Sequence, residues 1–299
     1  MGSRMFQLDT TPQRPGRVWS RGLELGKLGF SRLFAPAALL GLIGLLPTLY
    51  FAERLGDATF TRDRLLELLR SPHFIADFLL VEVLVLVCGS FVNALIIRQV
   101  ERTATGTPAS HELRYALGKL PALVLAGILV FVTLMIGLLI AALVGGVLGA
   151  LLGAALGRGA AIAVTQVCVF AAMVFIMVNL LFFQFAIVLD SKGPVAALNH
   201  SCALVFHNWW RTFLVLLITV VVVVLCVVVV MLPLSIPFAA WLHPLAGADT
   251  GRSLLVKGVL RLVGTAVFTP FVVGILYVLY RDLKVRRAAR SVPTATLQA

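Results

Sequence analysis

The sequence GGVLGALLGAALG, residues 145–157, lies within a stretch from Pro121 to Asp190 that is almost without charge. Glycine recurs in it at every fourth position. Residues four apart share one helical face, and glycine on that face lets two helix backbones approach closely in lipid. The stretch therefore predicts membrane helices with a glycine zipper, in which a second helix packs closely against Gly145, Gly149 and Gly153.

The composition supports a membrane protein independently of this stretch. The chain is 60% hydrophobic and 13% charged, whereas soluble domains are about 25% charged. An apolar run of about 18 residues or more can cross the hydrocarbon core, which is about 30 Å thick. Such runs predict an all-α integral membrane protein with about six transmembrane helices in three hairpins, at about 34–52, 78–97, 121–143, 163–189, 213–236 and 259–280.

One apolar run is too long for a single perpendicular crossing. Residues 121–156 would form about 54 Å of helix at about 1.5 Å per residue. The run either forms one arm of a long helical hairpin that turns at Gly157-Arg158-Gly159, or it breaks near Gly145-Gly146 and adds a seventh span. We favour the hairpin.

The basic residues indicate the topology. With six spans, 17 lysines and arginines lie on the side of the termini and 8 on the other side. Cytoplasmic loops carry the excess of positive charge, so both termini are expected in the cytoplasm. We divide the chain into a basic cytoplasmic segment with an amphipathic helix (1–33), a transmembrane domain (34–281) and a basic cytoplasmic tail (282–299). The first apolar run begins too late for a cleavable signal and is expected to remain as the first span.

Several classes of function find no support in the sequence. The net charge of +12 is dispersed between the spans and no nucleic-acid-binding module accompanies it, so we expect membrane lipids rather than nucleic acid as partners. The four cysteines show no C-x-x-C spacing, and the five histidines form no metal-ligand pattern. No catalytic motif is present. We therefore expect no catalytic residues, no metal and no cofactor.

A mildly basic amphipathic stretch precedes each pair of spans, at Trp19–Phe34, Ser110–Leu120 and Pro194–Arg211. We expect these stretches to form interfacial helices on the cytoplasmic side. In the third, Pro194 suits the first position of a helix. Its apolar residues recur at helical spacing and predict one membrane-facing surface, made of Val195, Leu198, Cys202, Val205, Phe206 and Trp209.

The polar side of this third stretch is a candidate contact site. Trp209 and Trp210 suit the level of the lipid headgroups, and Arg211 can bind phosphate. His200 and His207 share a face and are expected to contact headgroups or water. Two roles are open for this stretch. It either serves only as a topological anchor, or its polar side recognises lipid headgroups or a partner.

The same residues resemble a known family. Ala197-Leu198-Asn199-His200-Ser201-Cys202-Ala203-Leu204-Val205, followed by Trp210-Arg211-Thr212-Phe213, is similar to the A-L-x-x-S-x-x-L-V and W-R-x-F pattern of YciC-like bacterial inner-membrane proteins. The pattern also occurs in the membrane domain attached to some glycerophosphoryl diester phosphodiesterases. The resemblance covers about 25 residues. It implies a multi-pass inner-membrane protein of poorly defined role, discussed in terms of envelope integrity, and it carries over no catalytic residue.

Polar residues inside the spans are a second group of candidates. Glu82 is costly in lipid unless it is paired, protonated or functional. Its depth matches that of Arg261, so an ion pair is expected, with Asn93 on the same face. The alternatives are a hydrogen-bonded carboxyl that orders the helices, a proton or cation relay, and a residue at the edge of the span that reaches the headgroups. Gln166 and Gln184 are eighteen residues apart and share a face, where we expect interhelical hydrogen bonds.

Two functions remain after these considerations. The first is a non-enzymatic inner-membrane protein that acts through lipid or protein contacts, with a membrane-protein partner or a second copy of the chain as further candidates. The second is a small transporter or channel with a polar site around Glu82, Asn93 and Gln166. An intramembrane enzyme is a weaker third reading. The sequence names neither a substrate nor a lipid.

Overall fold

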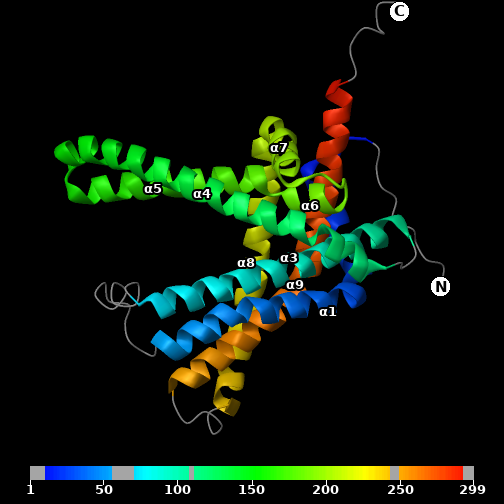
Figure 1. Ribbon diagram of the computed structural model, residues 1–299, viewed down its shortest axis with the longest axis horizontal. Coiled ribbons are helices and arrows are strands. Elements are labelled where there is room, and N and C mark those ends of the chain that lie inside the picture. Colours follow the sequence, from blue (N-terminus) through cyan, green and yellow to red (C-terminus); the bar gives the residue numbers. More distant parts are fainter. Residues whose placement is uncertain (1–10, 56–70, 108–110, 243–248, 292–299) are drawn as a thin grey trace, which may run out of the picture. The chain divides into compact units, whose positions relative to one another are not determined.

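The computed structural model describes residues 11–55, 71–107, 111–242 and 249–291, and at 51–55, 156, 230–242, 249–257 and 291 it describes only the backbone. Its regular elements in these ranges are all helical (Figure 1). They are α1 (Pro15–Leu55), α3 (Pro72–Thr105), α4 (Glu112–Leu156), α5 (Arg158–Leu180), α6 (Phe183–Val188), α7 (Pro194–Val205), the 3₁₀ turn η1 (Phe206–Asn208), α8 (Trp209–Leu242) and α9 (Asp249–Ser291).

Six helical segments among the described residues are long and apolar enough to cross a membrane. They cover Pro15–Tyr50, Pro72–Thr105, Glu112–Ala155, Arg158–Val188, Pro194–Val229 and Gly258–Arg290. The expectation of an all-α fold with six apolar helices is confirmed. The chain divides into two compact units, which we call unit 1 (residues up to 120 and 215–282) and unit 2 (residues 121–214 and from 283 onward). α4, α8 and α9 each contribute to both units.

Unit 1 contains α1, α3, the first part of α4 and the unit-1 parts of α8 and α9. Local sequence defines the ends of α3: Ser71 Oγ accepts a hydrogen bond from the backbone N–H of Phe74, and Gly106 adopts a left-handed conformation after the last turn. Fully or nearly fully buried side chains gather toward one end of the unit. They are Val18, Leu25, Leu33, Val92, Ile96, Val100, Ile275, Tyr277, Leu279 and Tyr280.

The closest approach in unit 1 is between α1 and α9. A Cβ atom added to Gly22 would lie 2.4 Å from Ile275 Cα, and one added to Gly26 would lie 2.7 Å from Phe271 Cα. From the other helix, a Cβ on Gly274 would lie 2.5 Å from the carbonyl oxygen of Gly22. Two backbones are therefore in direct contact here, which is the geometry that small residues permit in membrane helices.

Two of the three predicted interfacial helices are not separate elements. Trp19–Phe34 is part of the continuous helix α1, with Leu25 and Leu33 buried, and most of Ser110–Leu120 is the first part of α4. The physical reason is that these stretches bury small and apolar residues against neighbouring helices, so nothing interrupts the helix. Pro194–Arg211 does contain a separate helix, α7, followed by η1.

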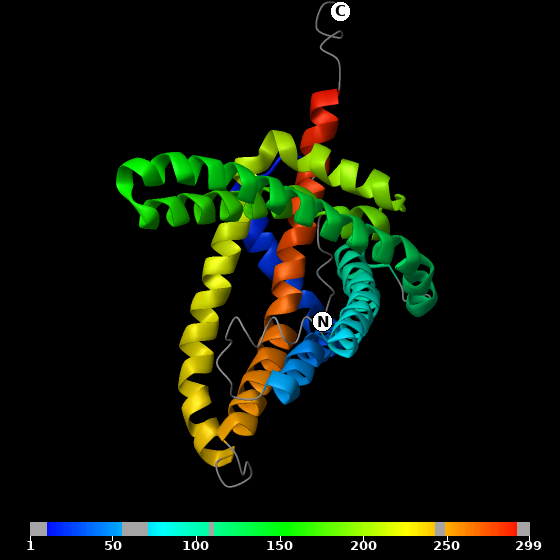
Figure 2. The ribbon, with the colours of Figure 1, turned by 60° about the vertical axis from the view of Figure 1, so that its left-hand side comes forward.

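Unit 2 is built on the antiparallel pair of α4 and α5, which lie side by side in both views (Figures 1 and 2). α4 continues through Gly145 and Gly146 and ends at Leu156, and α5 begins at Arg158. Gly157 between them has a φ of 90°, which a residue with a Cβ rarely adopts. The helical hairpin is therefore confirmed, and the alternative break at Gly145-Gly146 is wrong.

The zipper glycines face α5 inside this hairpin. A Cβ on Gly145 would lie 2.9 Å from Cys168 Cβ, one on Gly149 would lie 2.5 Å from the carbonyl oxygen of Ala161, and one on Gly153 would lie 2.8 Å from Ala161 Cβ. Thr165 Oγ1 also lies 3.0 Å from the carbonyl oxygen of Gly145, across the two helices. The second helix at the glycine face is thus the next helix in the chain.

Two helices run continuously across the segment boundaries expected from the sequence. α1 passes through residues 33 and 34, and α9 passes through 281 and 282, without interruption. The limits of the apolar runs mark where polarity changes along a helix, and a helix continues wherever its backbone hydrogen bonds can continue.

Candidate functional site

A break in the helical chain of unit 2 positions the candidate site. α5 ends at Leu180 and α6 begins at Phe183, which leaves backbone groups without helical partners. Ser201 Oγ of α7, which is fully buried, accepts from the N–H of Phe182 at 3.0 Å and donates to the carbonyl oxygen of Asn179 at 2.7 Å. A single hydroxyl therefore satisfies both sides of the break and joins α7 to it.

The faces of α7 differ from the prediction. The residues buried on the protein side are Ala197, Ser201, Leu204 and Val205. Of the predicted membrane-facing set, Val195 and Phe206 are exposed while Leu198, Cys202 and Trp209 are half-buried. Val205, also in the predicted set, is buried instead. The reason is that small residues and Ser201 allow α7 to pack closely on α6, which apolar periodicity alone does not reveal.

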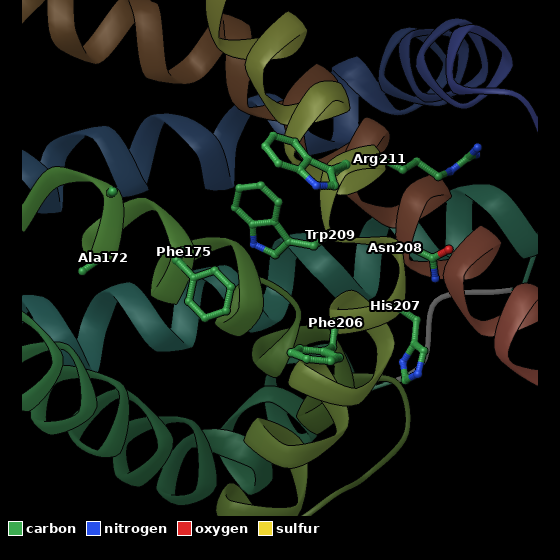
Figure 3. A pocket seen from close by; sticks show the side chains of 9 residues that line it. Ala172, Phe175, Phe206, His207, Asn208, Trp209 and Arg211 are labelled. Carbon is green, nitrogen blue, oxygen red and sulfur yellow. The ribbon is translucent and has the colours of Figure 1, made fainter. Parts of the chain in front are cut away.

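An aromatic cluster follows α7 at the start of α8. The Trp209 ring stacks on Phe213 with a centroid distance of 5.1 Å and on Phe175 of α5 at 5.9 Å. Trp210 packs edge-on against Trp209 at 4.8 Å and is 76% exposed. In Figure 3, Phe175, Trp209 and Phe206 face one side of a hollow of about 870 Å³, while His207, Asn208 and Arg211 point to the other side.

A charged network lies next to this cluster, between the loop after α6, α7 and the end of α9. Lys284 Nζ donates to Asp190 Oδ1 at 2.7 Å, and His200 Nε2 lies 3.5 Å from Asp190 Oδ2. Arg287 Nη1 lies 3.3 Å from His200 Nδ1. If Nδ1 accepts from the guanidinium, the hydrogen of the neutral ring is on Nε2, which lies near the carboxylate without forming a hydrogen bond to it.

The charges of unit 2 are strongly unbalanced. Asp190 is the single acidic side chain in residues 121–214 and 283–299, and it is already engaged by Lys284 and His200. The same residues contain seven lysines and arginines: Arg158, Lys192, Arg211, Lys284, Arg286, Arg287 and Arg290.

Two of these basic residues, Arg287 and Arg290, line a groove. A hollow of about 560 Å³ is lined by Asn199, Cys202, Ala203, Phe206, His207, Arg287 and Arg290. Within the part of the chain that the structure describes, neither Arg287 nor Arg290 forms an ion pair with a carboxylate. Phe206 and His207 line both this groove and the aromatic hollow, so the two form one continuous surface, which we call the α7–α9 surface.

The predicted contact residues therefore take different positions. His207, Trp209, Trp210 and Arg211 all line the hollows of the α7–α9 surface. His200 instead lies in the network behind the groove, between Asp190 and Arg287.

The expected pair of Glu82 and Arg261 is wrong. Glu82 is exposed and makes no ion pair within the described ranges, and Arg261 Nη1 donates to Thr48 Oγ1 at 3.1 Å. The helical face of Glu82 enters the bundle only farther along α3, where Gly89 is buried and Asn93 half-buried. A depth match between two helices says nothing about the rotation of either helix, and this rotation turns Glu82 outward.

The two glutamines are also separated. Gln166 is exposed on α5, and Gln184 is half-buried on α6, beyond the helix break at Leu181 and Phe182. Because the break interrupts the helical repeat, the five-turn spacing that would place both side chains on one face no longer applies. In the residues that the structure describes, no three His, Cys, Asp or Glu side chains are close enough to hold a metal ion.

Sequence reasoning missed several residues of the site and the fold. Arg287 and Arg290 were assigned to a tail, although their spacing with Lys284 on an extended α9 could have placed them on one helical face. Gly22 and Gly26 form a small-x-x-x-small pattern, which was a usable signal for the contact with Gly274. The role of Ser201 had no such signal, because the helix break that it bridges is not visible in the apolar run.

Comparison with family models matches residues 33–283 to a family described as "Domain of unknown function (DUF7847)". No curated protein and no solved structure matches the chain.

Proposed function

The chain belongs to the DUF7847 family, whose function is unknown, and we propose a function from the physical chemistry of the α7–α9 surface. In this proposal the protein is a non-enzymatic, multi-pass protein of the bacterial inner membrane that binds anionic phospholipid headgroups there. The observation that carries it is the groove lined by Arg287, Arg290 and His207, in a unit whose one acidic side chain is already engaged.

Charge complementarity supports an anionic ligand. Arg287 contacts His200, and Arg290 Nε donates to the carbonyl oxygen of Arg286 at 3.4 Å, so neither charge is neutralised by a side chain of the described residues. A guanidinium binds phosphate oxygens with several donors at once. Each lysine or arginine near an anionic membrane surface contributes about 1 kcal/mol to the attraction.

The neighbouring aromatic cluster supports a location at the membrane interface. Trp210 is 76% exposed and Phe206 is 65% exposed, in the last turn before the apolar part of α8. Tryptophan is enriched where the hydrocarbon region meets the headgroups. The aromatic side chains would lie at acyl-chain level while Arg287 and Arg290 reach the phosphates.

The orientation of the protein is part of the proposal. The N–H of Gln13 donates to Asp282 Oδ1 at 2.7 Å, which brings the start of α1 and the last part of α9 to the same end of unit 1. The basic asymmetry of 17 against 8 residues favours the cytoplasm for this end. The cytoplasmic leaflet carries the anionic lipids that the groove would bind. A role in envelope integrity rests on the resemblance to YciC-like proteins.

A binding titration tests the proposal. Detergent-purified protein is titrated with phosphatidylglycerol and, separately, with zwitterionic phosphatidylcholine, and bound lipid is counted by native mass spectrometry. The double variant Arg287→Gln/Arg290→Gln should weaken phosphatidylglycerol binding about 25-fold, because two charges of about 1 kcal/mol each are lost. Binding of phosphatidylcholine should change little.

Arg158→Gln provides the matched control. It removes one positive charge from the same unit, at the turn between α4 and α5, and should leave phosphatidylglycerol binding within about fivefold of wild type. Equal affinity of wild type and the Arg287→Gln/Arg290→Gln variant for phosphatidylglycerol would refute the proposed site.

A further inference from the structure

Unit 1 has polar contacts at two levels, and their separation matches the two edges of a hydrocarbon core. At one end, Tyr50 OH donates to Asp77 Oδ2 at 2.7 Å, and Arg261 donates to Thr48. At the other end, the backbone of Gln13 donates to Asp282. On α9, no charged residue lies between Arg261 and Arg281. The twenty steps from Arg261 to Arg281 cover about 30 Å of helix, which equals the thickness of the hydrocarbon core.

The position of Arg261 at the edge of this region is held by α1. Its guanidinium lies against Gly44, where an added Cβ would be 3.4 Å from Nη2, and one turn later against the hydroxyl of Thr48. The side chain is exposed, and no carboxylate pairs with it in the ranges whose side chains the structure describes. A cation at the boundary of the hydrocarbon core is within reach of lipid phosphates.

An apolar groove extends from Arg261 toward the middle of the span. It has a volume of about 460 Å³ and lies between the unit-1 parts of α8 and α9, which are yellow and orange in Figure 2. On α8 it is lined by Val223 and Val227. On α9 it is lined by one helical stripe from Arg261 through Thr265 and Phe268 to Val272.

The dimensions of the groove fit one acyl chain. Arg261 and Val272 are eleven residues apart, about 16 Å along a helix, which is about half the thickness of the hydrocarbon core. The cation at the edge of the groove matches the phosphate of such a lipid, whereas the apolar middle of a partner helix carries no anion for it.

We propose that this groove is a second, separate lipid site, which binds one diacyl phospholipid of the leaflet on the Arg261 side. The phosphate lies on the guanidinium of Arg261, and one acyl chain follows the stripe to Val272. This site is independent of the α7–α9 surface, because its lining residues belong to unit 1 and none of them lines that surface.

Photocrosslinking tests this site. The full-length protein is placed in nanodiscs of phosphatidylethanolamine and phosphatidylglycerol with a trace of phosphatidylglycerol that carries a diazirine on one acyl chain. After irradiation, mass spectrometry maps the labelled peptides. In the wild type, label should concentrate on the peptides that contain Val223–Val227 and Gly264–Val272.

Two variants address the two halves of the site. Arg261→Gln should lower this labelling about fivefold, the loss of one phosphate-binding cation. Gly264→Leu should lower it at least as much, because a Cβ at Gly264 meets no atom within 4 Å and the added side chain fills the groove without disturbing the fold. Gly146→Leu is the control, since Gly146 on α4 has equally open surroundings.

The results separate this site from the first. Arg287→Gln/Arg290→Gln should leave labelling of the α8–α9 groove unchanged, whether or not the α7–α9 surface binds lipid. Wild-type labelling of residues 223–227 and 264–272 no stronger than that of the rest of α8 and α9, or equal labelling of these residues in wild type, Arg261→Gln and Gly264→Leu, would overturn the proposal.

Discussion

The two glycine contacts of this protein differ in what they hold together. Gly145, Gly149 and Gly153 lie against α5, the next helix in the chain, and the contact stays within one hairpin. Gly22 and Gly274 join α1 and α9, which are separated by most of the sequence. The first contact holds two helices that a short turn already joins, whereas the second joins α1 to the unit-1 part of α9.

A substitution at the α1–α9 contact should have the largest effect. In Gly22→Leu the new Cβ would be 2.4 Å from Ile275 Cα, and two backbones would have to separate. We expect a loss of at least about 3 kcal/mol in the free energy of unfolding. Thermal unfolding in detergent and the yield of monodisperse protein measure it. Gly16→Leu on the same helix, in open space, should behave as wild type. Equal stability of the two variants would show that close packing of α1 on α9 at Gly22 does not stabilise unit 1.

A substitution at the hairpin contact should cost less. The Cβ of Gly149→Leu would lie 2.5 Å from the carbonyl oxygen of Ala161, but the two arms are linked by a short turn and can separate locally. We expect a loss of about 2 kcal/mol, measured in the same thermal assay. Gly146→Leu, one residue along α4, should be neutral. If Gly149→Leu were also neutral, the zipper face would not be a contact.

The buried hydroxyl of Ser201 should have an effect of similar or smaller size. Ser201→Ala removes two buried hydrogen bonds, one from the N–H of Phe182 and one to the carbonyl oxygen of Asn179. The expected loss is about 1 to 2 kcal/mol. Ser20→Ala, which removes an exposed hydroxyl on α1, is the control. Equal stability of the two alanine variants would show that the break in unit 2 is held by other contacts.

The side of the membrane can be tested by thiol labelling. Thr107 of unit 1 and Ser191 of unit 2 are both exposed. Thr107→Cys and Ser191→Cys, each in a variant without Cys88, Cys168, Cys202 and Cys226, should react with an impermeant thiol reagent from the cytoplasm. Reaction of Ser191→Cys only from the opposite side would contradict the proposed orientation.

Much of the fold could be predicted from the sequence because length and hydrophobicity determine membrane helices. The six apolar segments and the hairpin turn at Gly157 follow from runs of residues along the chain. The rotation of a helix does not follow from such runs, which is why Glu82 faces outward and why Val205, expected to face the membrane, is buried.

The candidate site was predictable only in part. Trp209, Trp210 and Arg211 were identified from local composition, since aromatic and basic residues after an amphipathic stretch are typical of a membrane interface. Arg287 and Arg290 are far along the chain from α7, near the end of α9, and they line the groove through tertiary packing of α9. A pattern in one segment carries no information about such a distant partner.

The central claim is that the α7–α9 surface binds anionic lipid headgroups. The most direct measurement is an electron cryo-microscopy structure in nanodiscs that contain phosphatidylglycerol. We predict headgroup density between His207, Arg287 and Arg290, with acyl-chain density beside Phe206. A map that resolves these side chains and shows the groove without headgroup density would contradict the claim.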